Sequence, residues 1–326
     1  MAPGNRRQAF CTNRRLWPHH SHRDSTRKSF YQIRSVRSAN NKSALRLDPS
    51  DQNIMASNGE QLDPQGVDAI VSRNKQWRIS TRKRPILKAG PIDAMNEKLG
   101  IPVPEMIFGD NLVAIEHVPS GWAIDFNAFD ALDRVSKTAD GMLQVAYSKE
   151  WQRDRQHHHE GIKEVVKPFD WSYSTDFKGR THSPDAAVVW QPTDQSKDPI
   201  RTDLLSRPDP ILFYDDVIFY EDELADNGIA IFSCKIRVMA ERLLLLCRFF
   251  LRLDGVIVRV RDTRIYIELA SKTVIRQYTA REESYDVVQS KLQMHRENIP
   301  EVLRDANRIA PLLRTVEDTM DKVIIP

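Results

Sequence analysis

The sequence predicts an α+β protein, with a mainly antiparallel β-sheet core and flanking helices in a single domain. Runs of alternating apolar and polar residues recur after the first quarter of the chain, as is typical of strands with one buried face. An Asp254-Gly255 pair, which favours tight hairpin turns, lies between two strand-like runs. Helical spacing of apolar residues is found mainly after Tyr278. We expect this domain over residues 67–326, preceded by a disordered basic tail over residues 1–66.

The expected tail dominates the charge of the chain. Residues 1–47 contain 11 Lys or Arg and a single acid, Asp24, while the rest carries 37 of the 48 basic and 44 of the 45 acidic residues. An acidic body lacks the clustered cations that phosphate-backbone binding requires, so nucleic acid is not an expected partner. The tail has three interpretations: a mitochondrial targeting segment, a basic interaction tail, or a dispensable extension ahead of a start at Met55.

Cysteines and apolar runs exclude several classes of protein. Cys11, Cys234 and Cys247 are an odd number without C-x-x-C spacing, so neither a disulfide framework nor a zinc site is expected. The longest apolar run, from Leu243 to Cys247, is far shorter than the ~18 residues that cross a bilayer. We therefore expect no membrane association, no cofactor and a reducing compartment.

Two segments show clear period-two alternation. Trp122, Ile124 and Phe126 alternate with Ala123 and Asp125, which predicts a strand. The same pattern predicts a second strand over 169–178, where apolar residues and Thr175 hold the odd positions and polar residues hold the even positions. The polar, proline-containing segment from Thr181 to Asp209 is expected to be a long loop.

The Asp254-Gly255 pair predicts a hairpin with a two-residue turn. On one face this register pairs Leu253 with Val256, Leu251 with Val258 and Phe249 with Val260. On the other face it pairs Arg252 with Ile257, Phe250 with Arg259 and Arg248 with Arg261. Like charges in direct opposition are unfavourable, so an anion is expected beside them. That anion comes either from a neighbouring strand of the acidic body or from the carboxylate of a partner.

Helices are expected in two places. Asn127 resembles an N-cap with Asp130 three residues later, which predicts a short helix. After Tyr278 apolar residues recur at helical spacing as far as Val316, with interruptions near two prolines. These C-terminal helices are expected to pack on the sheet.

A search for catalytic motifs finds little. The sequence contains no G-x-x-x-x-G-K-[ST], G-x-G-x-x-G or G-x-S-x-G motif. The adjacent histidines His157–His159 point in different directions in any regular structure, so a solvated loop is expected rather than a metal site. The acidic cluster at Glu221–Asp226 remains as the basis of an alternative reading, an unrecognised hydrolase. The main expectation is a protein without catalytic or metal-binding residues.

Several strings together resemble the TIPRL family, the TIP-forty-one-like TOR signalling pathway regulators. They are VPEMIFGDN from Val103, NAFDAL from Asn127, KPFDWSYSTDFKG from Lys167, EDEL from Glu221, KIRVM from Lys235 and RFFLRLDGVIVRVRDTRIY from Arg248. The likeness covers about residues 76–282. It implies an α+β fold with antiparallel sheet and a cleft that accepts the C-terminal tail of a phosphatase.

The resemblance also implies a function. It is a non-catalytic regulator in TOR signalling that binds catalytic subunits of type 2A, 4 and 6 protein phosphatases and modulates their activity or assembly. A Tap or alpha-four-type phosphatase-associated protein is a further implied partner. The expected location is the cytoplasm, with the nucleus as a second compartment.

Six residues are expected to contact a partner. Asp130, Val260 and Asp262 match the family's binding cleft, although Val260 and Arg261 differ from the residues expected in animal members. The outer face of the predicted hairpin adds Arg248, Arg259 and Arg261. Structural roles are the alternatives for the two acids: Asp130 as a helix cap and Asp262 as a turn residue at the end of a strand.

Overall fold

The computed structural model describes residues 75–138, 169–205, 209–294 and 299–326, together with the backbones of three further strands. These strands are β1 (Gln8–Cys11), β2 (Val67–Val71) and β7 (Gln144–Tyr147). All elements below belong to one compact unit, residues 1–11 and 62–326. The predictions for the basic tail and for His157–His159 concern residues that lie almost wholly outside this description.

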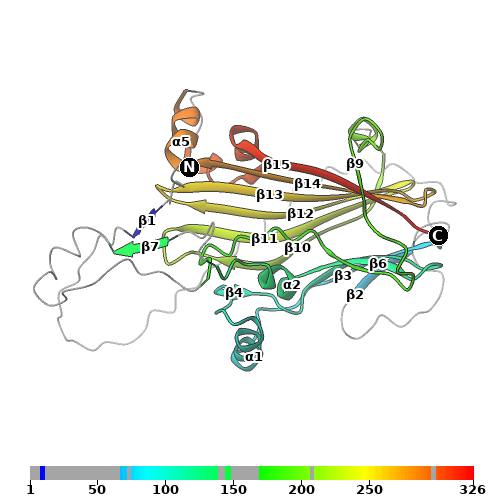
Figure 1. The fold of residues 1–326 in the computed structure, drawn as a ribbon, viewed down its shortest axis with the longest axis horizontal. Helices are drawn as coiled ribbons and strands as arrows, with labels where there is room; N and C mark the ends of the chain where they lie inside the picture. Colours follow the sequence, from blue (N-terminus) through cyan, green and yellow to red (C-terminus); the bar gives the residue numbers. More distant parts are fainter. Residues whose placement is uncertain are drawn as a thin grey trace, which may run out of the picture. The chain divides into compact units, whose positions relative to one another are not determined.

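The largest element is an eight-stranded antiparallel sheet (Figure 1). In spatial order its strands are β4 (Met106–Ile107), β10 (Ile211–Asp222), β11 (Gly228–Met239), β12 (Arg242–Leu253), β13 (Ile257–Glu268), β14 (Thr273–Ser284), β15 (Arg314–Ile324) and β9 (Gln191–Thr193). The five consecutive strands from β10 to β14 have 12 residues each and build the sheet as a series of hairpins. The predicted α+β class with antiparallel sheet is therefore confirmed.

A smaller five-stranded sheet has the order β2-β3-β5-β6-β8. Besides β2 it contains β3 (Trp77–Arg82), β5 (Leu112–His117), β6 (Trp122–Asn127) and β8 (Arg180–His182). The strand predicted at Trp122 is confirmed, because Trp122, Ile124 and Phe126 are fully buried. β1 and β7 form a separate parallel pair.

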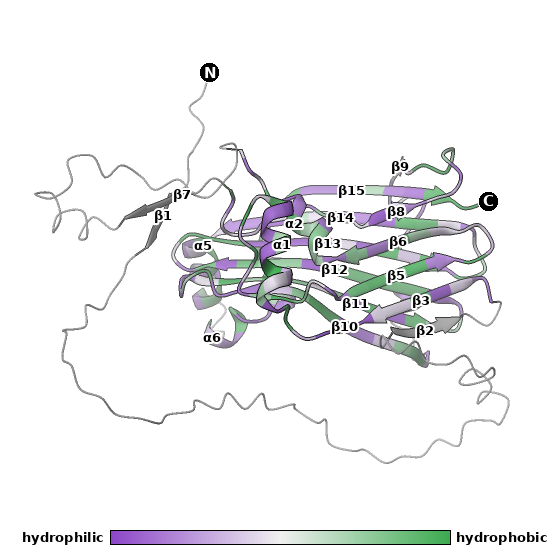
Figure 2. Cartoon of the chain, turned by 90° about the horizontal axis from the view of Figure 1, so that it is seen from below, coloured by the Kyte–Doolittle hydropathy of each residue, from purple (hydrophilic) through white to green (hydrophobic). Residues whose placement is uncertain are grey.

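The two sheets face one another across a shared core (Figures 1 and 2). Trp122 of β6 and Ile115 of β5 belong to the same buried cluster as Phe249 and Leu251 of β12. Hydrophobic and hydrophilic residues are interspersed along these strands in Figure 2, because successive side chains point to opposite faces. We call the core side of the eight-stranded sheet its inner face and the other side its outer face. Cys234 and Cys247 are buried free thiols.

Helices lie on both sides of the large sheet (Figure 1). They are α1 (Ala89–Leu99), α2 (Ala128–Asp133), α4 (Thr202–Leu205), α5 (Tyr285–Met294), α6 (Ile299–Val302), α7 (Ala306–Ile309) and the 3-10 helix η2 (Ala310–Leu312). We call α5, α6, α7 and η2 the helical cover. Among the described residues, no helix has the length and apolar character needed to span a membrane.

The helical cover packs on the large sheet, as predicted, and lies on its outer face. Val288 and Leu292 of α5 share a buried cluster with Phe250, Val258 and Val260 of the sheet. The predicted limits of this helical region, from after Tyr278 to Val316, were wrong at both ends. Strand β14 continues to Ser284, and the residues around Val316 form strand β15 instead of a helix. Pairing with β14 decides this conformation, which the local spacing of apolar residues did not indicate.

The hairpin forms where it was predicted, but its register differs by one residue. The amide of Val256 donates to the carbonyl oxygen of Leu253 (3.0 Å), so three residues, Asp254 to Val256, connect the strands. Gly255 supplies the positive φ, +71°, that this turn requires. The observed pairs are Leu253 with Ile257, Arg252 with Val258, Leu251 with Arg259, Phe250 with Val260, Phe249 with Arg261 and Arg248 with Asp262.

The strand predicted over 169–178 is not formed. The chain turns where Tyr173 donates its amide to Asp170 O (2.9 Å), and Tyr173 has φ +54°, which a strand does not allow. The odd positions are buried as expected, but Asp170 and Ser172 are buried as well. The alternation of apolar and polar residues over 169–178 therefore reflects burial of one side of the segment in the core, although the segment does not pair as a strand. The segment from Thr181 to Asp209, which was predicted to be a loop, contains the last two residues of β8 and all of β9 and α4.

Candidate partner-binding site

The corrected register separates the hairpin residues that were predicted to act together. Arg248, Val260 and Asp262 lie on the outer face, because their cross-strand partners place them there with Phe250. Arg259 and Arg261 lie on the inner face, opposite Leu251 and Phe249. The predicted opposition of Arg248 and Arg261 is therefore wrong, and one side of the hairpin does not display all three arginines.

Asp262 is the centre of a buried ionic cluster on the outer face. Its side chain is 0% exposed and accepts two hydrogen bonds from Arg248, Nε to Oδ1 (2.6 Å) and NH2 to Oδ2 (2.8 Å). Arg264 NH2 donates to Oδ2 (3.1 Å), and Arg281 NH1 lies 4.0 Å from the same oxygen. The anion expected beside Arg248 is thus present within the sheet, on the strand directly opposite.

One carboxylate serves three guanidinium groups in this Asp262 cluster, which leaves a surplus of positive charge. Burial is the main cause that lowers the pKa of Arg264. The charge of Asp262 opposes this shift, repulsion from Arg248 and Arg281 adds to it, and the charge of Asp318 opposes it weakly. The arginine side chains remain partly accessible, at 14% for Arg248, 27% for Arg264 and 25% for Arg281. The cluster therefore presents cations to solvent above a buried anion.

Val260 and Asp262 have no exposed surface of their own. Val260 lies beneath the helical cover, in contact with the cluster around Val288 and Leu292. Arg248 also reaches the cover, because its NH1 donates to Asn307 Oδ1 of α7 (2.7 Å). Arg248 therefore links Asp262 to the helical cover.

On the inner face, Arg259 binds the irregular segment after Phe169. Its NH1 donates to Ser174 Oγ (3.1 Å) and its Nε to Glu282 of β14 (3.0 Å). The half-buried Arg261 donates to the hydroxyl of Tyr278 (3.4 Å). Arg259 thus holds a segment that has no ladder bonds of its own, which is a structural role.

Asp130 belongs to a different part of the molecule. Its amide donates to Asn127 Oδ1 (2.9 Å), which confirms the predicted cap, and its Oδ2 pairs with Arg180 NH1 (3.1 Å). Arg180 also contacts Asp125 (3.3 Å) on the five-stranded sheet. Over the described ranges, no hydrogen bond or ion pair joins Asp130 to the hairpin residues. Sequence reasoning missed Arg180 because β8 reaches β6 only in the folded chain.

The acidic cluster lies at the turn between β10 and β11. Asp222 has a structural role, since its Oδ1 accepts the amide of Leu224 (2.7 Å) and its Oδ2 accepts that of Glu105 (3.0 Å). Burial and then the charge of Glu223 raise the pKa of Glu221. Burial, then Asp222, Glu223 and Asp226, raise the pKa of Glu105. These carboxylates repel one another, and no metal-binding group of His, Cys, Asp or Glu occurs among the residues described.

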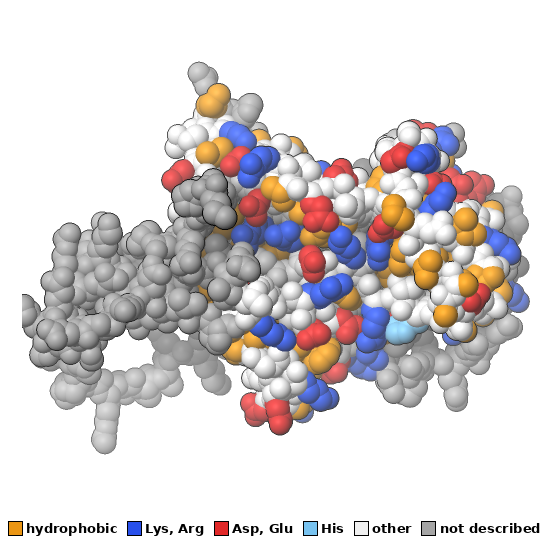
Figure 3. Space-filling view, in the orientation of Figure 1, with side chains coloured by type: hydrophobic (Ala, Val, Ile, Leu, Met, Phe, Trp, Pro, Cys, Tyr) orange, Lys and Arg blue, Asp and Glu red, His pale blue; other side chains and the backbone are white. Residues whose placement is uncertain are grey.

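Charged side chains of both signs are intermixed on the face of the molecule seen in Figure 3. Neither sign forms a continuous stripe among the coloured residues on this face. The arrangement suits local ion pairs of the kind found around Asp262, and it gives no track for a phosphate backbone on this side.

Comparison with known proteins connects these residues with one family. The family model described as "TIP41-like family" matches residues 106–289, which include all six predicted contact residues. The "Type 2A phosphatase activator TIP41" of Saccharomyces cerevisiae is 44% identical over 250 residues, which cover 72% of this chain and 69% of that protein. The "TIP41-like protein" of Homo sapiens is 39% identical over 251 residues, covering 77% and 88%. The "Type 2A phosphatase activator tip41" of Schizosaccharomyces pombe is 31% identical over 249 residues, covering 76% and 96%.

Proposed function

This chain belongs to the TIP41-like family, as its motifs led us to expect, and from that membership we propose that it is a non-catalytic regulator of type 2A protein phosphatases. The observation that carries the proposal is the likeness to two relatives, 44% and 31% identical, whose names describe them as activators of these enzymes. The match extends over most of the described part of the chain.

The proposal has finer parts. The chain binds the catalytic subunits of type 2A, 4 and 6 phosphatases, together with a Tap or alpha-four-type protein, and acts in TOR signalling in the cytoplasm and nucleus. The motifs quoted for the family carry these parts. Each part can be true or false independently of the others, since a chain that binds one catalytic subunit need not bind the others.

The Asp262 cluster supports a contact with a carboxylate. Three arginines surround a single buried anion and remain partly exposed, so a second carboxylate finds donors already in position. The C-terminal tail of a catalytic subunit ends in such a group. Val260 and Asp262 then contribute without touching the partner. Asp262 orients Arg248 and Arg264 through hydrogen bonds, and Val260 packs against the helical cover.

A binding experiment tests the proposal. The immobilised full-length chain is expected to retain type 2A, 4 and 6 catalytic subunits from an extract at low salt, identified by mass spectrometry. Retention of none of them would contradict the proposal as a whole.

A mutant cycle tests the tail contact separately. Arg264→Ala and deletion of the subunit's tail are each expected to weaken binding, and their combination to weaken it no further. Arg201→Ala is the control, because this exposed arginine pairs with Asp203 on α4, outside the cluster. Additive losses would mean that the tail binds elsewhere, with the phosphatase proposal intact.

The hydrolase alternative rests on the raised pKa of Glu221, a property that a general acid shares. It differs from the main proposal in one measurable respect. A hydrolase would lose turnover in Glu223→Gln, whereas a binding protein keeps its affinity for the phosphatase.

A further inference from the structure

Two buried thiols lie directly opposite one another on neighbouring strands of the large sheet. Cys234 of β11 is the cross-strand partner of Cys247 of β12, within a register that runs without a shift along both strands. Both side chains belong to the core between the two sheets and have 0% and 1% of their surface exposed. We call these two residues the thiol pair.

The ladder bonds show which kind of cross-strand pair the two cysteines form. The amide of Asp254 donates to the carbonyl oxygen of Asn227 (2.8 Å), so these two residues occupy a hydrogen-bonded position. Hydrogen-bonded and non-hydrogen-bonded positions alternate along an antiparallel ladder, and Cys234 lies an odd number of residues beyond Asn227. The thiol pair therefore occupies a non-hydrogen-bonded position, where Cα atoms lie about 4.5 Å apart and side chains approach most closely.

This geometry fits a disulfide bond. Disulfides join residues whose Cα atoms lie about 4.4 to 6.8 Å apart, so the thiol pair falls at the short end of that range. The side chains of Cys234 and Cys247 already form a hydrogen bond with each other. A zinc ion would need further ligands, and the described part of the chain contains no group of three or more His, Cys, Asp or Glu that could hold a metal.

Burial keeps the thiol pair unreactive while the sheet is closed. It raises the pKa of Cys247 well above the ordinary value of a thiol, and the hydrogen bond with Cys234 adds to this shift. The thiolate is the form that attacks an oxidant, so the closed pair reacts slowly. Oxidation therefore requires a local opening that brings solvent to the sulfur atoms.

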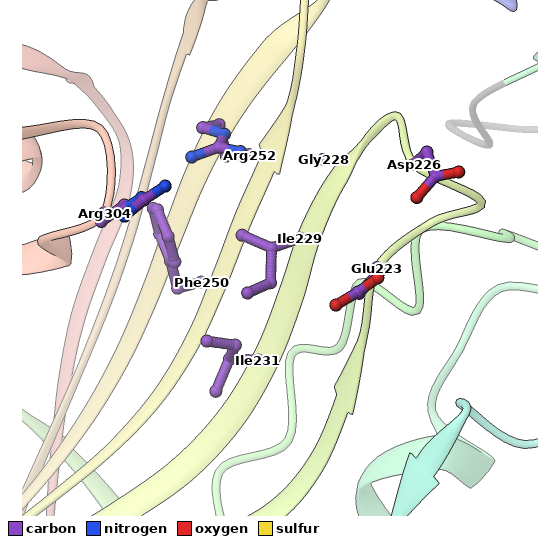
Figure 4. Close-up of a pocket in the computed structure, with 8 residues that line it drawn as sticks. All are labelled: Glu223, Asp226, Gly228, Ile229, Ile231, Phe250, Arg252 and Arg304. Carbon is purple, nitrogen blue, oxygen red and sulfur yellow. The ribbon is translucent and has the colours of Figure 1, made fainter. Parts of the chain in front are cut away.

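Solvent approaches the thiol pair from the outer face of the sheet. A groove follows this face of β11, and Figure 4 shows Ile229, Ile231 and Phe250 lining it. The chain neighbours of both cysteines line an adjoining cavity of about 230 Å³: Ser233, Lys235, Leu246 and Arg248. Each thiol is thus separated from this cavity only by its own strand, and a local separation of β11 from β12 exposes both thiols together.

We propose that the thiol pair is an oxidative modification site, at which a low-molecular-weight disulfide such as oxidised glutathione converts Cys234 and Cys247 into a reversible cross-strand disulfide. One protein thiolate attacks a sulfur of oxidised glutathione, which forms a mixed disulfide and releases one glutathione. The other protein thiolate then attacks the protein sulfur of the mixed disulfide, which forms the Cys234–Cys247 bond and releases the second glutathione. Each protein thiol gives a proton to solvent, and each released glutathione takes one up.

The disulfide fastens β11 to β12 and suppresses the opening through which it forms. Arg248, which binds Asp262, directly follows Cys247, so oxidation restrains the strand that carries this contact. Disulfides of reducing compartments are usually transient and respond to redox conditions. The inference does not depend on the phosphatase proposal, because it rests on the register and burial of the thiol pair.

Thiol–disulfide equilibrium with glutathione tests the proposal. The full-length chain with Cys11→Ser, which removes the third thiol, is equilibrated with reduced and oxidised glutathione, starting from either redox state. The equilibrium constant for the protein disulfide is expected to be at least tenfold larger in the folded chain than in concentrated urea, because the sheet already holds the thiols together. Tryptic digestion without reductant is expected to join Leu243–Arg248 to the peptide that ends at Lys235.

A matched variant moves one thiol along the same face of β12. Leu245→Cys with Cys247→Leu places this thiol opposite Ile236 instead of Cys234. Such diagonal neighbours lie about 7 to 8 Å apart, beyond the reach of a disulfide. The variant is expected to lose the preference of the folded chain for the disulfide, with circular dichroism as the check on its fold. The comparison of the folded with the urea-unfolded Cys11→Ser chain does not require this variant.

Three outcomes would overturn the proposal. They are an equilibrium constant no larger in the folded chain than in urea, loss of the β-sheet signal in circular dichroism on oxidation, and the same preference for the disulfide in a folded matched variant. None of these measurements involves a phosphatase, so the two proposals fail separately.

Discussion

Two regions of one sheet face treat charge in opposite ways. Over β12 to β14, the helical cover and three arginines enclose Asp262, which has no exposed surface. Over β11, the strand next to β12, Glu223, Asp226 and Arg304 line a groove without forming ion pairs among the described residues. The first region neutralises its buried charge within the chain. The second leaves charges in solvent, which suits a surface that meets a ligand.

The largest expected loss of stability comes from replacing Asp262, at the centre of the enclosed region. Asp262→Ala leaves Arg248, Arg264 and Arg281 around an empty site, and removing one partner of a buried ion pair costs about 3 to 5 kcal/mol. Because the arginines are partly exposed, we expect about 3 kcal/mol less free energy of unfolding, measured by urea denaturation. Asp262→Asn, which keeps the shape and an acceptor, is expected to lose less. A loss below about 1 kcal/mol in the alanine variant would show that the arginines rehydrate freely.

The helical cover provides the next test. Leu292→Ala removes a side chain that is 1% exposed, and such changes cost about 2 to 5 kcal/mol. Val287→Ala, on the same helix but at 40% exposure, is expected to change the unfolding free energy by about 0.5 kcal/mol or less. Equal effects of the two variants in thermal denaturation would contradict the packing of α5 on the sheet.

A third comparison sets two arginines against each other. Arg304→Ala is expected to alter stability by about 0.5 kcal/mol or less, because this exposed side chain has no ion pair with any residue that the structure describes. Arg248→Ala is expected to cost several times more, since it removes two hydrogen bonds from buried Asp262. Comparable urea midpoints for the two variants would remove the distinction between the enclosed and open regions.

The smallest effect concerns pH. The pKa of Glu221 is raised in the folded state, so its contribution to stability is present at acidic pH and is lost as the pH rises through that pKa. Burial is the main cause and the charge of Glu223 the second. Glu223→Gln is therefore expected to stabilise the protein by about 0.3 kcal/mol at pH 7 and not at pH 3. Urea titrations at both pH values measure this gain, and a gain at pH 3 would refute its electrostatic origin.

Local sequence signals predicted the elements whose stability is local. The cap at Asn127 depends on a residue three positions away, and the alternation at Trp122 can be read within a single strand; both are observed. The hairpin register was predicted wrongly because Val256 has an apolar side chain, as a strand residue would have, whereas Val256 belongs to the turn. Strand β15 escaped prediction because its charged sequence gains its conformation from pairing with β14.

The site was harder to predict than the fold. Shifting the hairpin register by one residue moved Arg259 and Arg261 to the inner face and placed Asp262 opposite Arg248. Arg281 of β14 lies opposite Val260. The alternation of residues along β14 could therefore have predicted that Arg281 lies on the outer face near Asp262. The groove on the outer face of β11 had no such signal, because Glu223, Phe250 and Arg304, which line it, meet only through the tertiary fold.

Strand β15 has a consequence for synthesis of the protein. It completes the edge of β14 and reaches β9, pairing Met320 with Thr193 across most of the second half of the chain. At about 5 to 20 residues per second, a ribosome needs roughly 2 to 6 s to proceed from the end of β14 to the start of β15. During that interval a 12-residue strand edge is exposed to neighbouring nascent chains, so β14 is the segment where we expect chaperones to be needed most.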